Sequence, residues 1–111
     1  MEIYCNEKLV TKNVTLCDTY FSKIKGLMFT KKIKPILMAF NIEHVIGIHM
    51  FFVFKPINAF WLNKSLEIVF MKKNLKPFTP LILPTEQAKY VLELPISQGK
   101  DLRIGNKLVF K

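Results

Sequence analysis

The chain has 111 residues, half of them hydrophobic, and a net charge of +9 from 17 basic and 8 acidic side chains. This length and apolar fraction predict one folded β-rich domain, residues 1–111, and exclude a disordered chain. The basic charge comes almost wholly from lysine, because Arg103 is the one arginine. Arginine supplies the planar fork that reads base edges, so the composition argues against sequence-specific nucleic-acid recognition.

The longest uncharged apolar stretch, residues 45–54, includes His49. A membrane-spanning helix needs about 20 apolar residues, so this stretch is too short to cross a bilayer. The first 11 residues contain Glu2 and Glu7 and no apolar run, so they do not resemble a signal peptide. We therefore expect a cytoplasmic protein with no membrane partner.

The first part of the chain predicts two short strands and one helix. Residues 3–5 and 14–17 are strand-like and lie on either side of a polar turn. Asp18 can accept a hydrogen bond from a free amide at a helix N-terminus, and Gly26 can take the conformation that ends a helix. A short helix is therefore expected over residues 19–26.

The two cysteines, Cys5 and Cys17, fall in the two predicted strands. Small secreted domains held by disulfides usually contain more cysteines, and the spacing of this pair matches no metal-binding motif. We expect two reduced, half-buried thiols and no metal site. A hairpin of the first two strands would bring the two residues close together.

From residue 36 onward the pattern is that of β-strands. Residues 48–54 carry apolar side chains on both alternating faces, which predicts a central strand buried on both sides. Asn63 and Gly105 mark turns. The other predicted strands are residues 36–40, 57–62, 66–71, 81–83, 90–94 and 107–110. The expected fold class is mostly β, an antiparallel sandwich or small barrel (jelly-roll-like) with one short helix.

Five segments, taken in chain order, resemble one family. The first two are KIKGLM at Lys23–Met28 and IHMFFVFKPIN at Ile48–Asn58. The other three are NLKPFTP at Asn74–Pro80, YVLELP at Tyr90–Pro95 and IGNKL at Ile104–Leu108. Together they resemble domain of unknown function 192 (uncharacterised protein family 0127), especially its archaeal-type members. The resemblance covers residues 16 to 110 and implies a compact β domain of sandwich or jelly-roll-like character, with no established enzymatic activity.

The sequence departs from the family pattern at three positions. Lys23 stands where the signature has arginine, and Asn58 and Asn106 stand where the pattern has aspartate. Replacing a carboxylate by an amide removes a potential general base or metal ligand. The departures therefore favour structural or binding roles for these positions.

Two polar residues interrupt apolar segments. His49 is either a ligand or acid–base residue, or a core histidine bonded to backbone. Glu93 lies between Leu92 and Leu94, and a charge in such a strand is usually paired. We predict that it forms an ion pair with Lys23 on the expected helix.

These residues predict a non-enzymatic binding module, without a cofactor, whose pocket holds a small molecule, a sugar or a protein partner. Its ligand-binding residues would be His49, Asn58, Glu93 and Lys23. Phe78, in a proline-flanked loop, is a further candidate for an exposed stacking residue or a lid. A hydrolase using His49 with Glu93 has the least support, because no phosphate-binding glycine loop or Gly-x-Ser-x-Gly motif is found.

The alternative to the pocket is an electrostatic, sequence-nonspecific nucleic-acid binder. It would use the most basic local patch of the chain, in which five lysines occur with no acid among them: Lys23, Lys25, Lys31, Lys32 and Lys34. Like charges so close together repel each other, so the same lysines are also typical of a merely solvated face.

Overall fold

The computed structural model describes residues 1–19, 28 and 30–111. Its strands form two sheets, with strand orders β2-β1-β8 and β3-β4-β7-β5-β6. The strands are β1 (Ile3–Cys5), β2 (Lys8–Thr11), β3 (Thr15–Cys17), β4 (Ile36–His44), β5 (Ile57–Leu62), β6 (Ile68–Leu75), β7 (Ala88–Pro95) and β8 (Leu108–Phe110). The described residues contain no helix.

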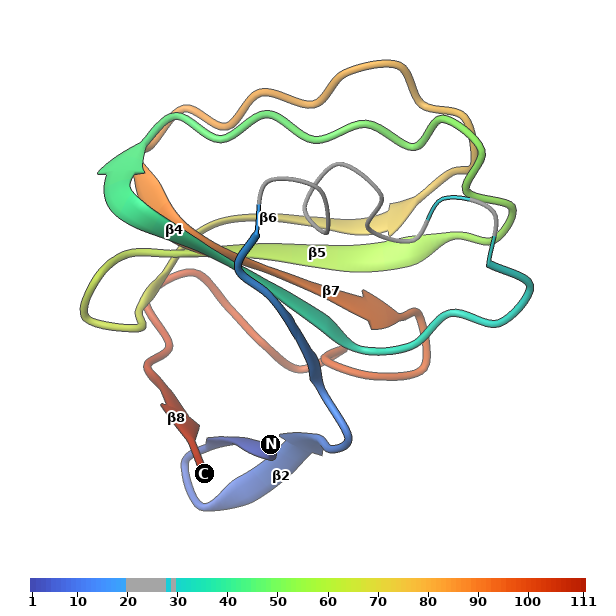
Figure 1. Ribbon diagram of the computed structural model, residues 1–111. Helices are drawn as coiled ribbons and strands as arrows, with labels where there is room; N and C mark the ends of the chain where they lie inside the picture. Colours follow the sequence, from blue (N-terminus) through green and yellow to red (C-terminus); the bar gives the residue numbers. More distant parts are fainter. Residues whose placement is uncertain (20–27, 29) are drawn as a thin grey trace.

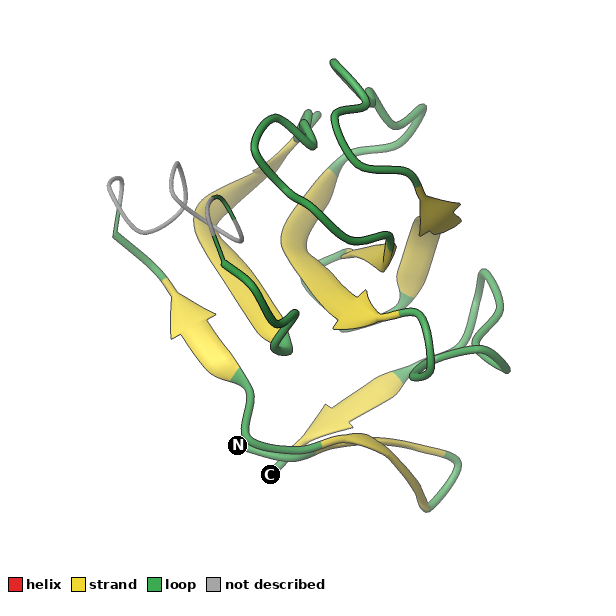
Figure 2. Ribbon diagram, turned by 90° about the vertical axis from the view of Figure 1, so that its right-hand side faces the viewer, coloured by secondary structure: helices red, strands yellow, loops and turns green. Residues whose placement is uncertain are grey.

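The five-stranded sheet lies between two other layers (Figures 1 and 2). On one side is the small sheet of β1, β2 and β8, and on the other two irregular segments run side by side, residues 45–56 and 76–87. We call these two segments the loop layer. A separate apolar cluster fills the space on each face of the large sheet. The fold is thus a mostly β sandwich, as expected, rather than a closed barrel.

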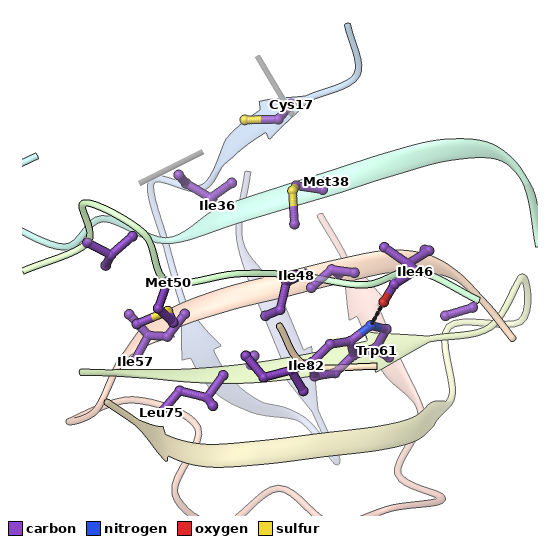
Figure 3. Packing of buried hydrophobic residues seen from close by; sticks show 14 of the residues in the cluster. Cys17, Ile36, Met38, Ile46, Ile48, Met50, Ile57, Trp61, Leu75 and Ile82 are labelled. Atoms are coloured by element: carbon purple, nitrogen blue, oxygen red, sulfur yellow. Dashed lines mark hydrogen bonds between the residues drawn. The ribbon is translucent and has the colours of Figure 1, made fainter. Parts of the chain in front are cut away.

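The strand buried on both faces is β5, in which every residue is buried. It pairs antiparallel with β6 on one side and with β7 on the other. Phe60 faces the cluster toward the small sheet, whereas Trp61 faces the cluster under the loop layer. The indole nitrogen of Trp61 donates a 2.8 Å hydrogen bond to the backbone oxygen of Ile46, which ties the loop layer to the sheet (Figure 3).

The prediction of a central strand at residues 48–54 was wrong. In this stretch only Ile48 makes a bridge, to Ile82, and the chain then turns. Phe52 has a φ of +57°, which ends the extended conformation, and Phe51 and Phe54 are exposed. The segment is apolar on both faces, but only one face covers the core, and the other is exposed to solvent.

The start of the chain also differs from expectation. Asn6 and Glu7 both have positive φ, which makes a tight two-residue hairpin turn, and the unpredicted strand β2 follows. Strand β3 joins the other sheet, where it pairs in parallel with β4. As a result Cys5 and Cys17 lie in different apolar clusters, on opposite faces of the large sheet. Neither forms a disulfide, and both are buried rather than half-buried.

The other predicted strands agree with the structure to different extents. Residues 57–62 are β5, and the strands expected at 36–40 and 90–94 fall within β4 and β7. The strand expected at 107–110 is β8, which begins one residue later. The strand expected at 66–71 is β6, which continues to Leu75, and of residues 81–83 only Ile82 is paired. The helix expected at 19–26 lies, except for Thr19, outside the described residues, and so do Lys23 and Lys25.

Candidate functional site

The structure does not bring His49, Asn58 and Glu93 together. Side chains alternate along a strand, so Asn58 shares the face of Phe60, toward the small sheet. Glu93 is paired with Ala59 and shares the opposite face, toward the loop layer. His49 is half-buried in the loop layer, and its Nδ1 accepts a 3.1 Å hydrogen bond from the amide of Phe51.

Asn58 uses its buried side chain inside the protein. Its Nδ2 donates to the backbone oxygens of Gln98, at 2.8 Å, and Ile96, at 3.4 Å. Its Oδ1 accepts a 2.9 Å bond from the amide of Asn74, a residue with positive φ. The amide group therefore connects β5 to the turn that follows β7 and to a distortion of β6.

Glu93 is the one acidic residue among the described side chains that is buried, with 6% exposed. Burial raises the pKa of its carboxyl to about 7. The ion pair with Lys23 stays a prediction, because Lys23 lies outside the described part of the chain.

A different feature has the form of a binding site. At one end of the large sheet lies an open groove of about 810 Å³. Strands β3, β4 and β5 begin at this end and β7 ends there, because β7 runs antiparallel to β4 and β5. The residues next to these strand ends therefore come together, although they are far apart in the sequence. They belong to residues 12–15, 32–35, 55–56 and 95–98.

Four lysines line this groove: Lys12, Lys32, Lys34 and Lys55. Among the described residues that line it, none is acidic and none is aromatic. A concave surface with charges of one sign concentrates its electric field and attracts ions of the opposite sign. Uncharged hydrogen-bonding groups from Thr15, Ser97 and Gln98 add directional contacts. The groove is therefore suited to an anion.

Hydrogen bonds fix the walls of the groove behind these side chains. The amide of Thr15 donates a 3.0 Å bond to the backbone oxygen of Pro35, which joins two of the lining segments. A further lining segment, residues 95–98, is held by the Asn58 bonds. The Thr11 hydroxyl also donates a hydrogen bond to Oε1 of Gln98. Asn58 therefore supports the groove from behind and does not line it.

Part of this site was predicted from the sequence. Lys32 and Lys34 belong to its lysine-rich stretch, and Lys31 is exposed nearby in the chain but does not line the groove. Lys12 and Lys55 were not predicted as site residues, because each is isolated from other lysines in the sequence. A lysine–proline pair comes directly before a predicted strand at both 34–35 and 55–56. This shared pattern could have indicated that Lys34 and Lys55 lie at the same end of the sheet.

Neither a metal centre nor a membrane span is found in the described parts of the chain. No group of three histidine, cysteine or acidic side chains there is placed to hold a metal ion. No helix there is long and apolar enough to cross a membrane.

The profile of one protein family, described as "Uncharacterized ACR" (domain of unknown function 192, DUF192), matches residues 3–110. The chain belongs to the DUF192 family. A UPF0127 protein of Thermococcus sibiricus is 32% identical over 92 residues, which are 80% of this chain and 58% of the relative. A UPF0127 protein of Thermococcus kodakarensis is 30% identical over 82% of this chain and 59% of its own length. This DUF192 chain thus spans somewhat over half of the curated relatives it matches.

Two solved structures share the DUF192 fold seen here. One is a protein of unknown function from Novosphingobium aromaticivorans, with a TM-score of 0.84 and 15% identity, covering 98% of this chain and 82% of the other. The second is from Sinorhizobium meliloti and is named for a proposed role in transcription regulation. Its TM-score is 0.85 at 20% identity, over 97% of this chain and 89% of the other. At these identities the likeness shows the fold alone.

Proposed function

We propose that this DUF192 protein is a binding module that holds a small anionic ligand in the lysine-lined groove. The observation that supports this function is the convergence of Lys12, Lys32, Lys34 and Lys55 on one concave surface, from three separate parts of the chain. Four cations held near one another repel, which costs stability, and a bound anion removes that cost.

The size and chemistry of the groove favour a small molecule over a polymer. Its volume of about 810 Å³ falls in the range of about 300–1,000 Å³ typical of small-molecule sites. Ile33 and Ile96 give it apolar surface beside the lysines. The ligand class is therefore a small carboxylate or phosphate ester with a short apolar part.

The lining residues support binding rather than catalysis. Among those described, the titratable side chains are all lysines, and the hydroxyls of Thr15 and Ser97 have no histidine or carboxylate next to them in the lining. Nucleophilic catalysis needs such a neighbouring base to activate a hydroxyl. The groove provides charge and hydrogen bonds, which are sufficient to hold an anion.

The net charge of +9 also favours a second candidate, electrostatic nucleic-acid binding. Single-stranded nucleic acid is usually bound by basic side chains together with aromatic rings on which the bases stack. The described lining of the groove contains no such ring and no arginine. We therefore place the small anion first and nucleic acid second.

The test compares two double variants that remove equal charge. Lys32→Gln/Lys34→Gln changes the groove, whereas Lys64→Gln/Lys107→Gln changes two exposed lysines outside its lining. Isothermal titration with pyrophosphate, citrate and glycerol 3-phosphate should show binding of at least one anion to the parent protein and to the control. The groove variant should lose about tenfold in affinity or more.

Three outcomes would contradict the proposal. One is that no anion in the panel binds the parent protein, and another is that both double variants lose affinity equally, which is the result of diffuse charge. The third is tight binding of an oligonucleotide with an affinity that falls steeply with salt while the small anions stay unbound. That result would support the nucleic-acid alternative.

A further inference from the structure

The outer surface of the loop layer exposes a group of large apolar side chains. Single exposed apolar residues are ordinary on protein surfaces, but a contiguous group of them usually marks a contact site. Between 45% and 61% of each side chain in this group is exposed. We call the group the aromatic crest, and its members are Phe51, Phe52, Phe54, Phe78, Leu81 and Leu83.

The two segments of the loop layer are held together by their backbones. Ile48 and Ile82 exchange hydrogen bonds of 3.0 and 2.8 Å, and Met50 makes two bonds of 2.8 Å, with Thr79 and Phe78. The side chains of Ile48, Met50 and Ile82 point into the core beneath (Figure 3). Because these residues already occupy the inner side, the crest residues remain on the outside.

Two crest residues are held in an unfavourable backbone conformation. Phe52 has a φ of +57° and Phe78 a φ of +62°. Bulky residues rarely adopt positive φ, and such strain is concentrated at functional sites. The ring of Phe78 packs against the rings of Phe52, at 6.1 Å between centroids, and Phe54, at 5.7 Å. Two strained residues, Phe52 and Phe78, are therefore part of a small aromatic cluster that remains half exposed.

Positive charge flanks the crest. Lys55 follows Phe54 directly, Lys76 lies two residues before Phe78, and both lysines are exposed. Residues 45–56 and 76–83 contain no acidic residue, and the acid of the loop layer, Glu86, lies at its far end, three residues after Leu83. The phenylalanine end of the crest is thus an apolar surface with lysines beside it, which complements a surface that is apolar inside and anionic outside.

We propose that the aromatic crest docks the protein on the surface of a bilayer that contains anionic lipids. The phenylalanines and leucines enter the boundary between headgroups and acyl chains, while Lys55 and Lys76 contact the anionic headgroups. Lysine suits this role because its apolar stem follows the inserted side chains and its ammonium reaches the headgroups. From the sequence we expect no membrane partner, because its longest apolar stretch is too short to cross a bilayer, but interfacial docking needs no span.

The composition of the crest favours a bilayer over a protein partner. Protein interfaces are enriched in aromatic residues, including phenylalanine, and in methionine and arginine, and they are depleted in lysine. The phenylalanines and leucines of the crest suit either partner, but its cations are lysines, which favour an anionic bilayer. This proposal is independent of the groove, since no crest residue lines the groove. Lys55 lines the groove and flanks the crest, and it is left unchanged in the test.

The experiment is vesicle flotation with two lipid compositions, phosphatidylcholine alone and phosphatidylcholine mixed with phosphatidylglycerol. The test variant is Phe52→Asn/Phe78→Asn, because asparagine tolerates positive φ and should preserve the backbone. The control is Leu9→Asn/Ile104→Asn, which replaces two exposed apolar residues outside the loop layer. Thermal unfolding of both variants checks that they are folded.

We expect the parent protein and the control to float with the phosphatidylglycerol vesicles and to bind phosphatidylcholine alone less well. The Phe52→Asn/Phe78→Asn variant should bind the anionic vesicles about tenfold more weakly or worse. The proposal fails if the parent protein does not float with anionic vesicles, or if the crest variant floats as well as the control. A parent protein that stays in solution as a dimer, and becomes monomeric in the crest variant, would overturn it in favour of self-association.

Discussion

The Nδ2 of Asn58 lies 2.8 Å from the backbone oxygen of Gln98, so a buried amide on β5 holds a wall of the lysine-lined groove. An aspartate at this position could not donate that bond while ionised. The amide is thus chemically matched to its two carbonyl partners, and the departure from the family pattern at Asn58 has a local structural reason.

Asn58→Asp should therefore destabilise the protein by about 2–4 kcal/mol at neutral pH, because it places a carboxylate against carbonyl oxygens in a buried site. The loss should shrink in acid, where the protonated carboxyl can donate. Asn106→Asp is the matched control. There the Oδ1 atom accepts the bond, at 2.9 Å from the amide of Arg103, and a carboxylate can do the same. Urea unfolding at pH 5 and pH 7.5 measures both, and equal losses would contradict this account.

Glu93 should make stability fall as the pH rises. Its pKa is raised from 4.5 to about 7 in the folded protein, so the folded state binds more protons than the unfolded state between these values. The contribution of Glu93 is fully present below pH 4.5 and is lost by about pH 7. In the Glu93→Gln variant this dependence should disappear, with a gain of about 3 kcal/mol at pH 8.

The sign of that change also tests the ion pair with Lys23 predicted from the sequence. A paired carboxylate would make Glu93→Gln less stable than the parent protein at pH 8. Melting temperatures at pH 4 and pH 8 distinguish the two cases. A lower melting temperature for the variant at pH 8 would contradict the effect of burial and favour the pair.

Gly99 and Gly105 both have positive φ, +74° and +94°, but their surroundings differ. A Cβ on Gly99 would lie 3.0 Å from atoms of Leu94 and Phe60, whereas a Cβ on Gly105 would have no neighbour within 4 Å. Gly105→Ala should cost about 1 kcal/mol from the backbone alone. Gly99→Ala should cost about 2–4 kcal/mol, because crowding adds to the backbone strain. Chemical denaturation measures the free energy of unfolding of both variants. Similar losses would show that the side chains around Phe60 can shift to accept the added methyl group.

Trp61→Phe should loosen the loop layer more than the rest of the protein. The change removes the indole donor and leaves the buried backbone oxygen of Ile46 without its 2.8 Å partner. A loss of about 1–3 kcal/mol is expected from that group. In hydrogen exchange, the amides of Ile48 and Met50 should exchange faster while those of β1 and β8 change less. An equal increase in the exchange rates of both sheets would show that the bond stabilises the whole fold and not the loop layer in particular.

The sequence predicted the strands whose boundaries are marked by local signals. The hairpin of β5 and β6 was found because Asn63 follows a strongly apolar run, and the side chain of Asn63 indeed accepts bonds from the amides of Ser65 and Glu67. Strand β2 was missed because it is four residues long and half polar, so its pairing with β1 depends on the turn at Asn6.

Residues 48–54 show the limit of periodicity. A loop that covers a core and also presents an apolar outer surface has the same pattern as a strand buried on both faces. Only the backbone conformation separates the two cases, and the positive φ of Phe52 is not encoded by any glycine or asparagine. The groove was predicted only in part for another reason, since it forms where strands that are distant in the sequence begin and end together.

The positions of Cys5 and Cys17 give the protein a thiol in each of its two cores, one between the sheets and one under the loop layer. Both are buried and neither forms a disulfide, so each reacts with a thiol reagent only when its own layer opens. Labelling rates of the two single-cysteine variants would therefore time the separation of the small sheet and the lifting of the loop layer independently.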